Sequence, residues 1–251
     1  MVASTETSSL WAIAHRGTPR HFPENTIAGF EHALRLGCNG IEFDVQLTRD
    51  EVPVVYHDRT LSRADGGRRR VHQFDLDELR RLDAGARFPG ARRRHRIPLL
   101  TEVLERLAGR TRLLVEIKAR EGLGGAERHR QLASRVAEML RGQADAWVLS
   151  FDADILRTVA KTSSGLPRVL NLRPLFPGHG AKLRRAMPQV VDADVRGLTP
   201  AFGRRIRRGG RRLWSFTCNT ATQVRTAREA GAAAIISDRV DWLIDRLERK
   251  A

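Results

Sequence analysis

Two histidines, an arginine and a pair of acidic residues stand close together in the first sixty residues of the chain. His15 and Arg16 follow one short apolar run, His57 follows another, and Glu42 and Asp44 lie inside a third. Imidazoles transfer protons near neutral pH, carboxylates bind divalent cations, and arginine binds phosphate oxygens. Together these groups supply what cleavage of a phosphodiester requires.

The acidic residues are predicted to converge on one site. Glu42 and Asp44 are two positions apart, so both point the same way from a strand. Glu116 lies in another apolar segment and is predicted to point inward as well. Three inward carboxylates form an all-oxygen site suited to Mg²⁺ or Ca²⁺. The alternative is a buried ion network in which these acids pair with Arg16 and Lys118.

The two histidines are the candidates for proton transfer. One of His15 and His57 can act as a general base on the attacking hydroxyl or water, while the other protonates the leaving alkoxide. Arg16 and Lys118 supply positive charge for phosphate oxygens, and the arginine can bind bidentately. A single histidine at a strand end is more often a structural hydrogen-bonding residue, but two beside a carboxylate cluster favour catalysis.

Short buried strands alternating with amphipathic helices must position these side chains. Nine strands are predicted, at residues 11–15, 40–45, 52–56, 112–117, 146–150, 168–172, 189–193, 212–217 and 233–237. Helical patterns cover residues 26–36, 76–82, 100–107, 127–140, 153–161, 200–208, 221–229 and 239–249. The first helix is predicted to begin after an Asn25 N-cap and to stop at Gly37.

The spacing of the strands predicts a closed barrel. Only residues 46–51 separate the second and third strands, too few for a parallel crossover, so these two are predicted to form an antiparallel hairpin. Counting the hairpin once leaves eight β-then-α units, as in a (β/α)₈ TIM barrel. A doubly wound open sheet is the alternative, disfavoured because no Gly-rich dinucleotide loop follows the first strand. Residues 58–98 are predicted to form a small inserted cap over the barrel mouth of a single domain, 1–251.

Composition and charge fit a globular protein with anionic partners. The chain has 251 residues, of which 41% are hydrophobic and 29% charged, and no run of eighteen apolar residues. Its net charge of +16 comes almost entirely from arginine, with basic runs at 68–70, 92–96, 204–208 and 211–212. An anionic membrane surface is therefore a candidate partner, whereas few aromatic residues argue against specific nucleic-acid binding. Residues 1–9 are predicted to be a disordered lead-in without a secretory signal, and Cys38 and Cys218 to be reduced thiols of a cytoplasmic protein.

A collinear set of short motifs extends the first pattern along the chain. The motifs are Ala14-His15-Arg16-Gly17, Pro23-Glu24-Asn25-Thr26, Glu42-Phe43-Asp44-Val45, His57-Asp58, Leu82-Asp83-Ala84-Gly85, Ile97-Pro98-Leu99-Leu100, Glu116-Ile117-Lys118, Ser150-Phe151 and Ile235-Ile236-Ser237-Asp238. They are dense from about residue 12 to 118 and thinner afterwards. In this set the chain resembles the glycerophosphodiester phosphodiesterase family.

The resemblance implies a TIM barrel that hydrolyses glycerophosphodiesters to sn-glycerol 3-phosphate and an alcohol with the help of a divalent cation, Mg²⁺ or Ca²⁺. The implied roles are metal ligation by Glu42, Asp44 and Glu116, general acid–base catalysis by His15 and His57, and phosphate contact by Arg16 and Lys118. Glu24 and Asn25 also match the family, so a functional role for them stands beside the interpretation of Asn25 as a helix cap. Residues 58–98 resemble the family's small inserted region, which caps the site.

One segment departs from the family pattern. The family usually has Trp-Thr-Val-Asn on a late strand, where this chain has Phe216-Thr217-Cys218-Asn219. Phe216 keeps an aromatic wall without the indole donor, and Trp214 shares its face one step deeper, so both are predicted to contact substrate. The altered aromatic wall and the basic surface leave two alternatives to hydrolysis of small glycerophosphodiesters. One is a lipid-directed phosphodiesterase acting on lysophospholipids or phosphoinositides, and the other is a non-catalytic barrel that binds phosphate ligands or nucleic acid.

Overall fold

Eight parallel strands close into a barrel, as predicted. The computed structural model describes residues 10–90, 93–118 and 125–248. Its strands are β1 (Trp11–His15), β2 (Gly40–Leu47), β3 (Pro53–Val55), β4 (Arg112–Ile117), β5 (Ala146–Ser150), β6 (Arg168–Leu172), β7 (Val190–Asp194), β8 (Arg212–Phe216) and β9 (Ala234–Ser237). Parallel pairing runs from β1 through β9, β8, β7, β6, β5 and β4 to β2, and β2 pairs with β1 to complete the ring. The prediction of a (β/α)₈ barrel is therefore confirmed.

The second and third strands form the predicted hairpin. β3 is antiparallel to β2 and stands outside the ring, with Val45 opposite Val55 and Leu47 opposite Pro53. β2 extends to Leu47, two residues farther than predicted, and is buried along its whole length. Because β2 overshoots its parallel neighbours and β3 turns back along it, the chain that follows β3 returns to the level of Asp44, to whose carbonyl Tyr56 N–H donates a hydrogen bond of 2.9 Å.

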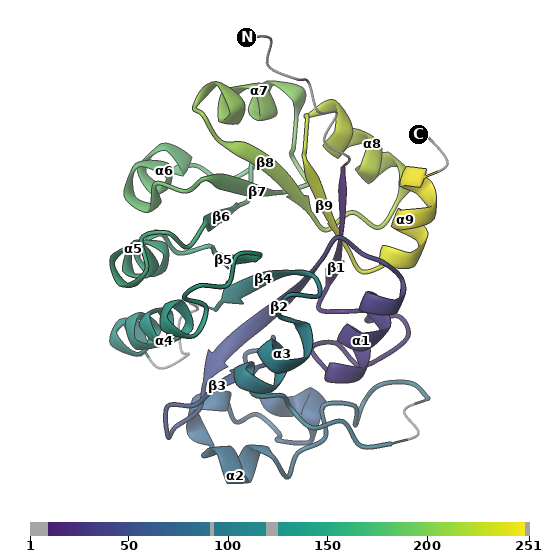
Figure 1. Cartoon of the computed structure of the whole chain (residues 1–251), viewed down its shortest axis with the longest axis vertical. Coiled ribbons are helices and arrows are strands. Elements are labelled where there is room, and N and C mark those ends of the chain that lie inside the picture. The colour runs from purple at the N-terminus through teal and green to yellow at the C-terminus, as the bar shows by residue number, and fades with distance from the viewer. Residues whose placement is uncertain (1–9, 91–92, 119–124, 249–251) are drawn as a thin grey trace.

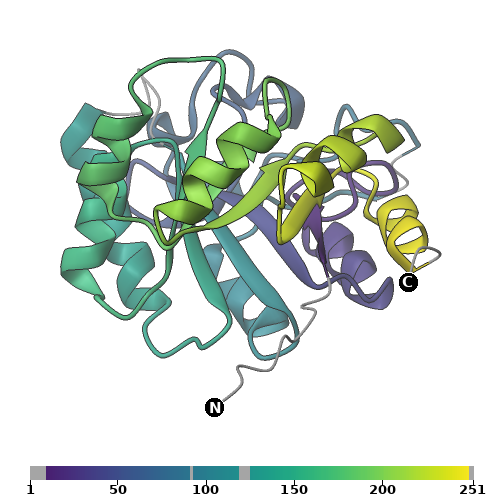
Figure 2. The same ribbon diagram turned by 90° about the horizontal axis from the view of Figure 1, so that it is seen from above.

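Helices surround the barrel on the outside (Figures 1 and 2). They are α1 (Ile27–Arg35), α2 (Leu76–Leu79), α3 (Leu100–Leu107), α4 (Gly125–Met139), α5 (Ala153–Thr162), α6 (His179–Ala186), α7 (Pro200–Arg208), α8 (Ala221–Glu229) and α9 (Val240–Glu248). The predicted helices are present with ends shifted by a few residues, and α6 was not predicted. No helix in the described ranges is long and apolar enough to cross a bilayer.

Apolar side chains fill two separate layers of the barrel. A large cluster lies between the strands and the surrounding helices, and a smaller one lies inside the ring. Trp147 and Trp214 belong to the inner cluster, and Trp11 packs against both with ring centroids 5.9 and 6.0 Å away. Polar and charged residues, rather than apolar ones, occupy the carboxyl ends of several strands on the inside. The barrel is therefore packed below and polar at the end where active sites of this fold lie.

Residues 58–90 and 93–98 form a small subassembly beside β3, in the lower part of Figure 1. Within it, two 3₁₀ turns, η1 (Leu61–Ala64) and η2 (Val71–Gln73), precede α2. It has a buried cluster of its own, which includes Leu61, Leu79 and Ile97. An ion pair of 2.7 Å between Arg80 and Glu102 links it to α3. Three parts of the sequence predictions lie outside the described residues: the lead-in at residues 1–9, Arg92 of the second basic run, and Arg249 at the end of the last predicted helix.

Candidate active site

Strand register brings the predicted acids and one histidine to the same end of the barrel. β1 and β2 pair so that His15 stands opposite Glu42, and β2 and β4 pair so that Asp44 stands opposite Glu116. The two acids of β2 are two positions apart and therefore share the inner face. These four residues come from three adjacent strands, so their side chains meet.

The three carboxylates form one buried group. Glu42, Asp44 and Glu116 each offer an oxygen within 4.8 Å of the others. Lys118 Nζ lies 2.7 Å from Asp44 Oδ1 and 2.5 Å from Glu116 Oε1, and Arg16 Nε lies 3.1 Å from Asp44 Oδ2. The ion network that was the alternative interpretation is thus present, but it matches two cations to three acids. One negative charge is left over when all three carboxylates are ionised.

The unbalanced charge falls on Glu42. Burial, together with the charges of Asp44 and Glu116, raises the pKa of Glu42 well above its ordinary value. Burial acts in the same direction on Asp44, but Lys118 and Arg16 outweigh it and hold the pKa of that carboxyl well below its ordinary value. Glu42 Oε1 is buried and has no hydrogen-bond partner. An orphaned carboxylate oxygen beside two others is a chemical environment that fits a hard divalent cation.

Two asparagine amides hold the acids in place. Asn25 Nδ2 donates to Asp44 Oδ2 at 2.8 Å, and the Asp44 N–H donates back to Asn25 Oδ1 at 3.2 Å. Asn171 Nδ2 donates to Glu116 Oε2 at 3.2 Å. The prediction that Asn25 is the N-cap of α1 is wrong. Asn25 has a φ of 58° and turns its side chain to Asp44, while the Thr26 hydroxyl caps the helix by accepting from Gly29 N–H.

His15 is oriented by a carboxylate on the neighbouring strand end. Its Nδ1 lies 2.5 Å from Asp238 Oδ1, and its Nε2 faces Glu42 Oε2 at 3.8 Å. Asn219 fixes Asp238 in turn, because Asn219 Nδ2 donates to Asp238 Oδ2 at 2.6 Å and Asp238 N–H donates to Asn219 Oδ1 at 2.9 Å. The sequence motifs contained Asp238 and Asn219, but residue spacing alone gave neither a role.

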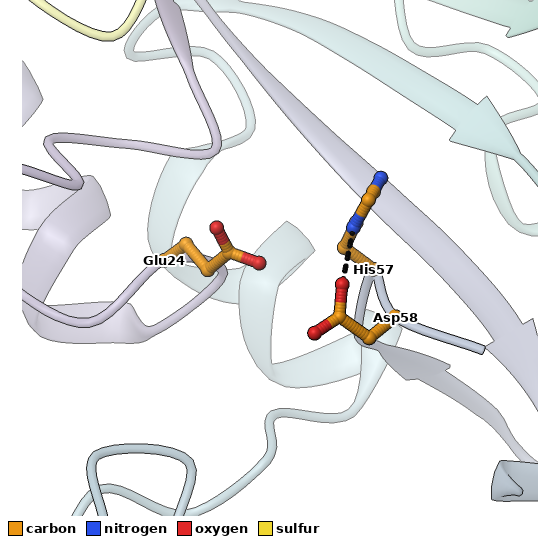
Figure 3. Close-up of side chains that lie close together, drawn as sticks. All are labelled: Glu24, His57 and Asp58. Carbon is orange, nitrogen blue, oxygen red and sulfur yellow. Dashed lines mark hydrogen bonds and ion pairs between the residues drawn. The ribbon is translucent and has the colours of Figure 1, made fainter. Parts of the chain in front are cut away.

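His57 is also held by an aspartate, and it lies near Asp44. Its Nδ1 lies 2.8 Å from Asp58 Oδ1, as Figure 3 shows. The imidazole is near enough to Asp44 for its charge to contribute to the lowered pKa of that carboxyl. The hairpin explains this proximity, since β3 returns the chain to the level of Asp44. Both predicted histidines therefore lie beside the same carboxylate group.

A second acidic group adjoins His57. Glu24, His57 and Asp58 offer ligand atoms within 4.8 Å of one another (Figure 3). Arg63 Nη1 lies 3.2 Å from Glu24 Oε2 and Arg63 Nε lies 3.5 Å from Asp58 Oδ2, and Arg16 also pairs with Glu24. Arg63 contacts both carboxylates and Arg16 is shared between Glu24 and Asp44, whereas Glu42 Oε1 in the buried trio has no partner. The trio is therefore the better site for a cation.

Two cavities open beside the buried trio. The first, of about 490 Å³, is lined by residues of β1, the loop before α1, the ends of β3 and β9 and the inserted region, among them His15, Arg16, Glu24, Tyr56, Arg63, Arg87, Phe88 and Asp238. The second, of about 360 Å³, is lined by Glu116, Lys118, Phe151, Asn171, Arg173, Phe176, His179 and Lys182, with Ile117, Leu172 and Pro177. Arg16 thus lines the first cavity, and Lys118 lines the second together with Glu116.

The two predicted aromatic contacts lie at different depths. Phe216 is half-buried, and its ring meets the edge of Phe151, a lining residue of the second cavity, at 5.8 Å between centroids. Trp214 does share the face of Phe216, but it is fully buried among the tryptophans that fill the lower barrel. The expectation that Trp214 contacts substrate is therefore corrected, because one step deeper along β8 is already the closed interior.

Comparisons with known proteins match one family along nearly the whole chain. A family model described as the glycerophosphoryl diester phosphodiesterase family matches residues 15–242. The glycerophosphodiester phosphodiesterase of Caldanaerobacter subterraneus subsp. tengcongensis is 32% identical over 239 residues, which cover 94% of this chain and 97% of the relative. The glycerophosphodiester phosphodiesterase of Bacillus subtilis is 27% identical, over 91% of this chain and 83% of the relative.

Solved structures share the fold. A phosphodiesterase from Oleispira antarctica, in complex with its product sn-glycerol-3-phosphate, superposes with a TM-score of 0.82 at 24% identity, over 94% of this chain and 96% of that one. A glycerophosphodiester phosphodiesterase from Agrobacterium tumefaciens str. C58 gives a TM-score of 0.70 at 26% identity, over 91% of this chain and 96% of that one.

Proposed function

The chain belongs to the glycerophosphoryl diester phosphodiesterase family, and on that premise we propose that it hydrolyses glycerophosphodiesters to sn-glycerol 3-phosphate and an alcohol. We propose Glu42, Asp44 and Glu116 as ligands of a divalent cation, and His15 and His57 as the general acid–base pair. The observation that supports this most directly is the meeting of the two imidazoles at one buried carboxylate trio with a surplus negative charge.

The trio fits the cation that the family resemblance implies. Its donors are all carboxylate oxygens, which suit Mg²⁺ and Ca²⁺, and one of them, Glu42 Oε1, lacks any partner in the protein. A bound divalent cation would supply positive charge to a phosphate oxygen and offset the charge that develops during displacement. Asn25 and Asn171 keep two of the three ligands in fixed orientations without adding charge.

Arg16 and Lys118 are proposed to bind the phosphate of the substrate. Lys118 is buried and Arg16 is half-buried, both pair with Asp44, and each lines one of the two cavities. This arrangement suits a diester whose phosphate contacts both cations and whose two alcohol groups extend into the two cavities. Fixed charges of this kind stabilise a transition state because they need no reorganisation when negative charge develops.

The histidines are proposed to move the protons. Each imidazole has its Nδ1 held by an aspartate, Asp238 for His15 and Asp58 for His57, which leaves Nε2 as the atom that faces the reaction. An alkoxide leaving group needs a proton as the phosphorus–oxygen bond breaks, and the incoming hydroxyl or water must lose one. Two oriented imidazoles, His15 near Glu42 and His57 near Asp44, can serve these two transfers.

A ³¹P-detected assay tests the proposal. Glycerophosphocholine, glycerophosphoethanolamine and glycerophosphoglycerol are incubated with the protein in EDTA and after addition of Mg²⁺ or Ca²⁺. The diester signal should convert to sn-glycerol 3-phosphate only when metal is present, and His15→Ala and His57→Ala should abolish the conversion while remaining folded. His21→Ala, at an exposed histidine that lines neither cavity, is the matched control and should keep full activity. Turnover that persists in either active-site variant would remove the assigned roles.

A further inference from the structure

The loop between β6 and α6 presents two large apolar side chains to solvent at the barrel mouth. Leu175 is 72% exposed and Phe176 is 61% exposed, and in the described residues only Met187 is a comparably exposed large hydrophobic. Isolated exposed apolar residues are common, but two in succession at the rim of a cavity indicate a surface that binds another molecule. Phe176 itself lines the second cavity, next to Glu116 and Lys118.

Backbone structure holds these side chains outward. Phe176 N–H donates to Arg173 O at 3.0 Å, which closes a turn with Pro174 at its second position and Leu175 at its tip. Pro177 follows, and Gly178, with a φ of 88°, caps α6. A side chain placed on Gly197 of the next loop would collide with Leu175 at 2.5 Å, so the two loops are in close contact. The turn and the contact with the Gly197 loop therefore support the apolar tip.

Two basic side chains flank this tip on its cavity side. Arg173 and Lys182 line the same cavity as Phe176 and are exposed. On the ring of helices, α6 is separated from the inserted region by α4 and α5, so the tip and the cap occupy different sides of the mouth (Figure 1).

We propose that this tip, Arg173–Gly178, docks the barrel mouth on an anionic phospholipid bilayer. Leucine and phenylalanine enter the boundary between headgroups and acyl chains, while Arg173 and Lys182 attract anionic headgroups. The docking places the second cavity at the lipid surface. It does not depend on the proposed hydrolysis, because lipid binding is measured without turnover.

Vesicle binding tests the proposal. The whole protein is sedimented with sucrose-loaded vesicles of phosphatidylcholine alone or with phosphatidylglycerol at low and high salt. Binding should require phosphatidylglycerol and weaken with salt. Leu175→Ser, at a residue outside both cavities, should lower the partition coefficient several-fold, and Leu175→Ser with Phe176→Ser should lower it about tenfold. Leu175→Trp should raise it, since tryptophan favours the interface.

Met187→Ser and Met187→Trp are the matched controls, because Met187 is 63% exposed but lies at the far end of α6. They should leave binding unchanged. Equal binding by wild type and both Leu175 variants overturns the proposal and assigns the attraction to the arginine-rich surface at large. It is also overturned if the serine variants lose affinity for a single-stranded oligonucleotide as strongly as for vesicles, since the tip would then contact nucleic acid.

Discussion

Glu42 and Asp44 are neighbours on one strand, yet their removal should affect stability in opposite ways. Without metal, the raised pKa of Glu42 favours its uncharged form, and its Oε1 has no partner to lose. Glu42→Gln should therefore melt no lower than wild type in EDTA. Asp44 is ionised and paired with Lys118 and Arg16, so Asp44→Asn should leave both cations short of a counter-charge and melt at a lower temperature.

The size of the Asp44 effect follows from its contacts. Removing one partner of a buried ion pair costs about 3–5 kcal/mol. Lys118 keeps Glu116 at 2.5 Å, Arg16 keeps Glu24 at 3.3 Å, and the amide at position 44 keeps Asn25, so we take the lower end, about 3 kcal/mol. At about 2–4 °C per kcal/mol for a chain of this size, the melting temperature should fall by about 6–12 °C.

Scanning fluorimetry or calorimetry in EDTA, and then with excess Mg²⁺ or Ca²⁺, measures both variants. A cation at 100 times its Kd should stabilise wild type by about 2.7 kcal/mol, and Glu42→Gln should lose most of that gain. A Glu42→Gln protein that melts well below wild type in EDTA, or that is stabilised by metal as strongly as wild type, would refute the charge assignment at the trio.

Three further variants or substrates probe other parts of the site. Burial raises the pKa of Asp192 well above its ordinary value of 3.8. As pH rises, the unfolded chain therefore loses this proton before the folded protein does, and the stability of wild type falls. In thermal melts from pH 4 to 8, Asp192→Asn should be more stable than wild type above about pH 4 and lose that advantage at pH 4. Asp238→Asn should lower kcat at constant KM, by less than the roughly 100-fold that loss of a general acid or base costs, because the asparagine still orients His15 partly; a change confined to KM contradicts an orienting role. A diester with a p-nitrophenolate leaving group should restore activity to one of His15→Ala and His57→Ala and not the other, since only the general acid becomes dispensable; rescue of both, or of neither, contradicts a division of roles.

Sequence periodicity was enough to predict the barrel. Short apolar segments alternate with helical patterns. The six residues between the second and third strands allow only a hairpin, so the lengths of the connections left eight parallel strands for the barrel. Helix α6 escaped prediction for a physical reason. Its segment His179–Ala186 has only Leu183 and Ala186 as apolar anchors among basic residues, so it lacks the apolar stripe that identifies a helix.

The site was predictable only as far as local patterns reach. The acids and histidines were found because strand ends and period-two spacing place them. The partners that orient them come from distant segments: Asp238 lies 223 residues from His15, and Asn171 lies 55 residues from Glu116. Asn25 was read as a helix cap because its position in the sequence suits one, and only the left-handed backbone there turns its amide to Asp44.

Anomalous diffraction from crystals soaked in Mn²⁺ tests the central claim most directly, since manganese accepts the same oxygen ligands as magnesium. One strong peak is expected, bonded to oxygens of Glu42, Asp44 and Glu116. A peak at Glu24, His57 and Asp58 instead, or no peak at the buried trio at saturating metal, would contradict it.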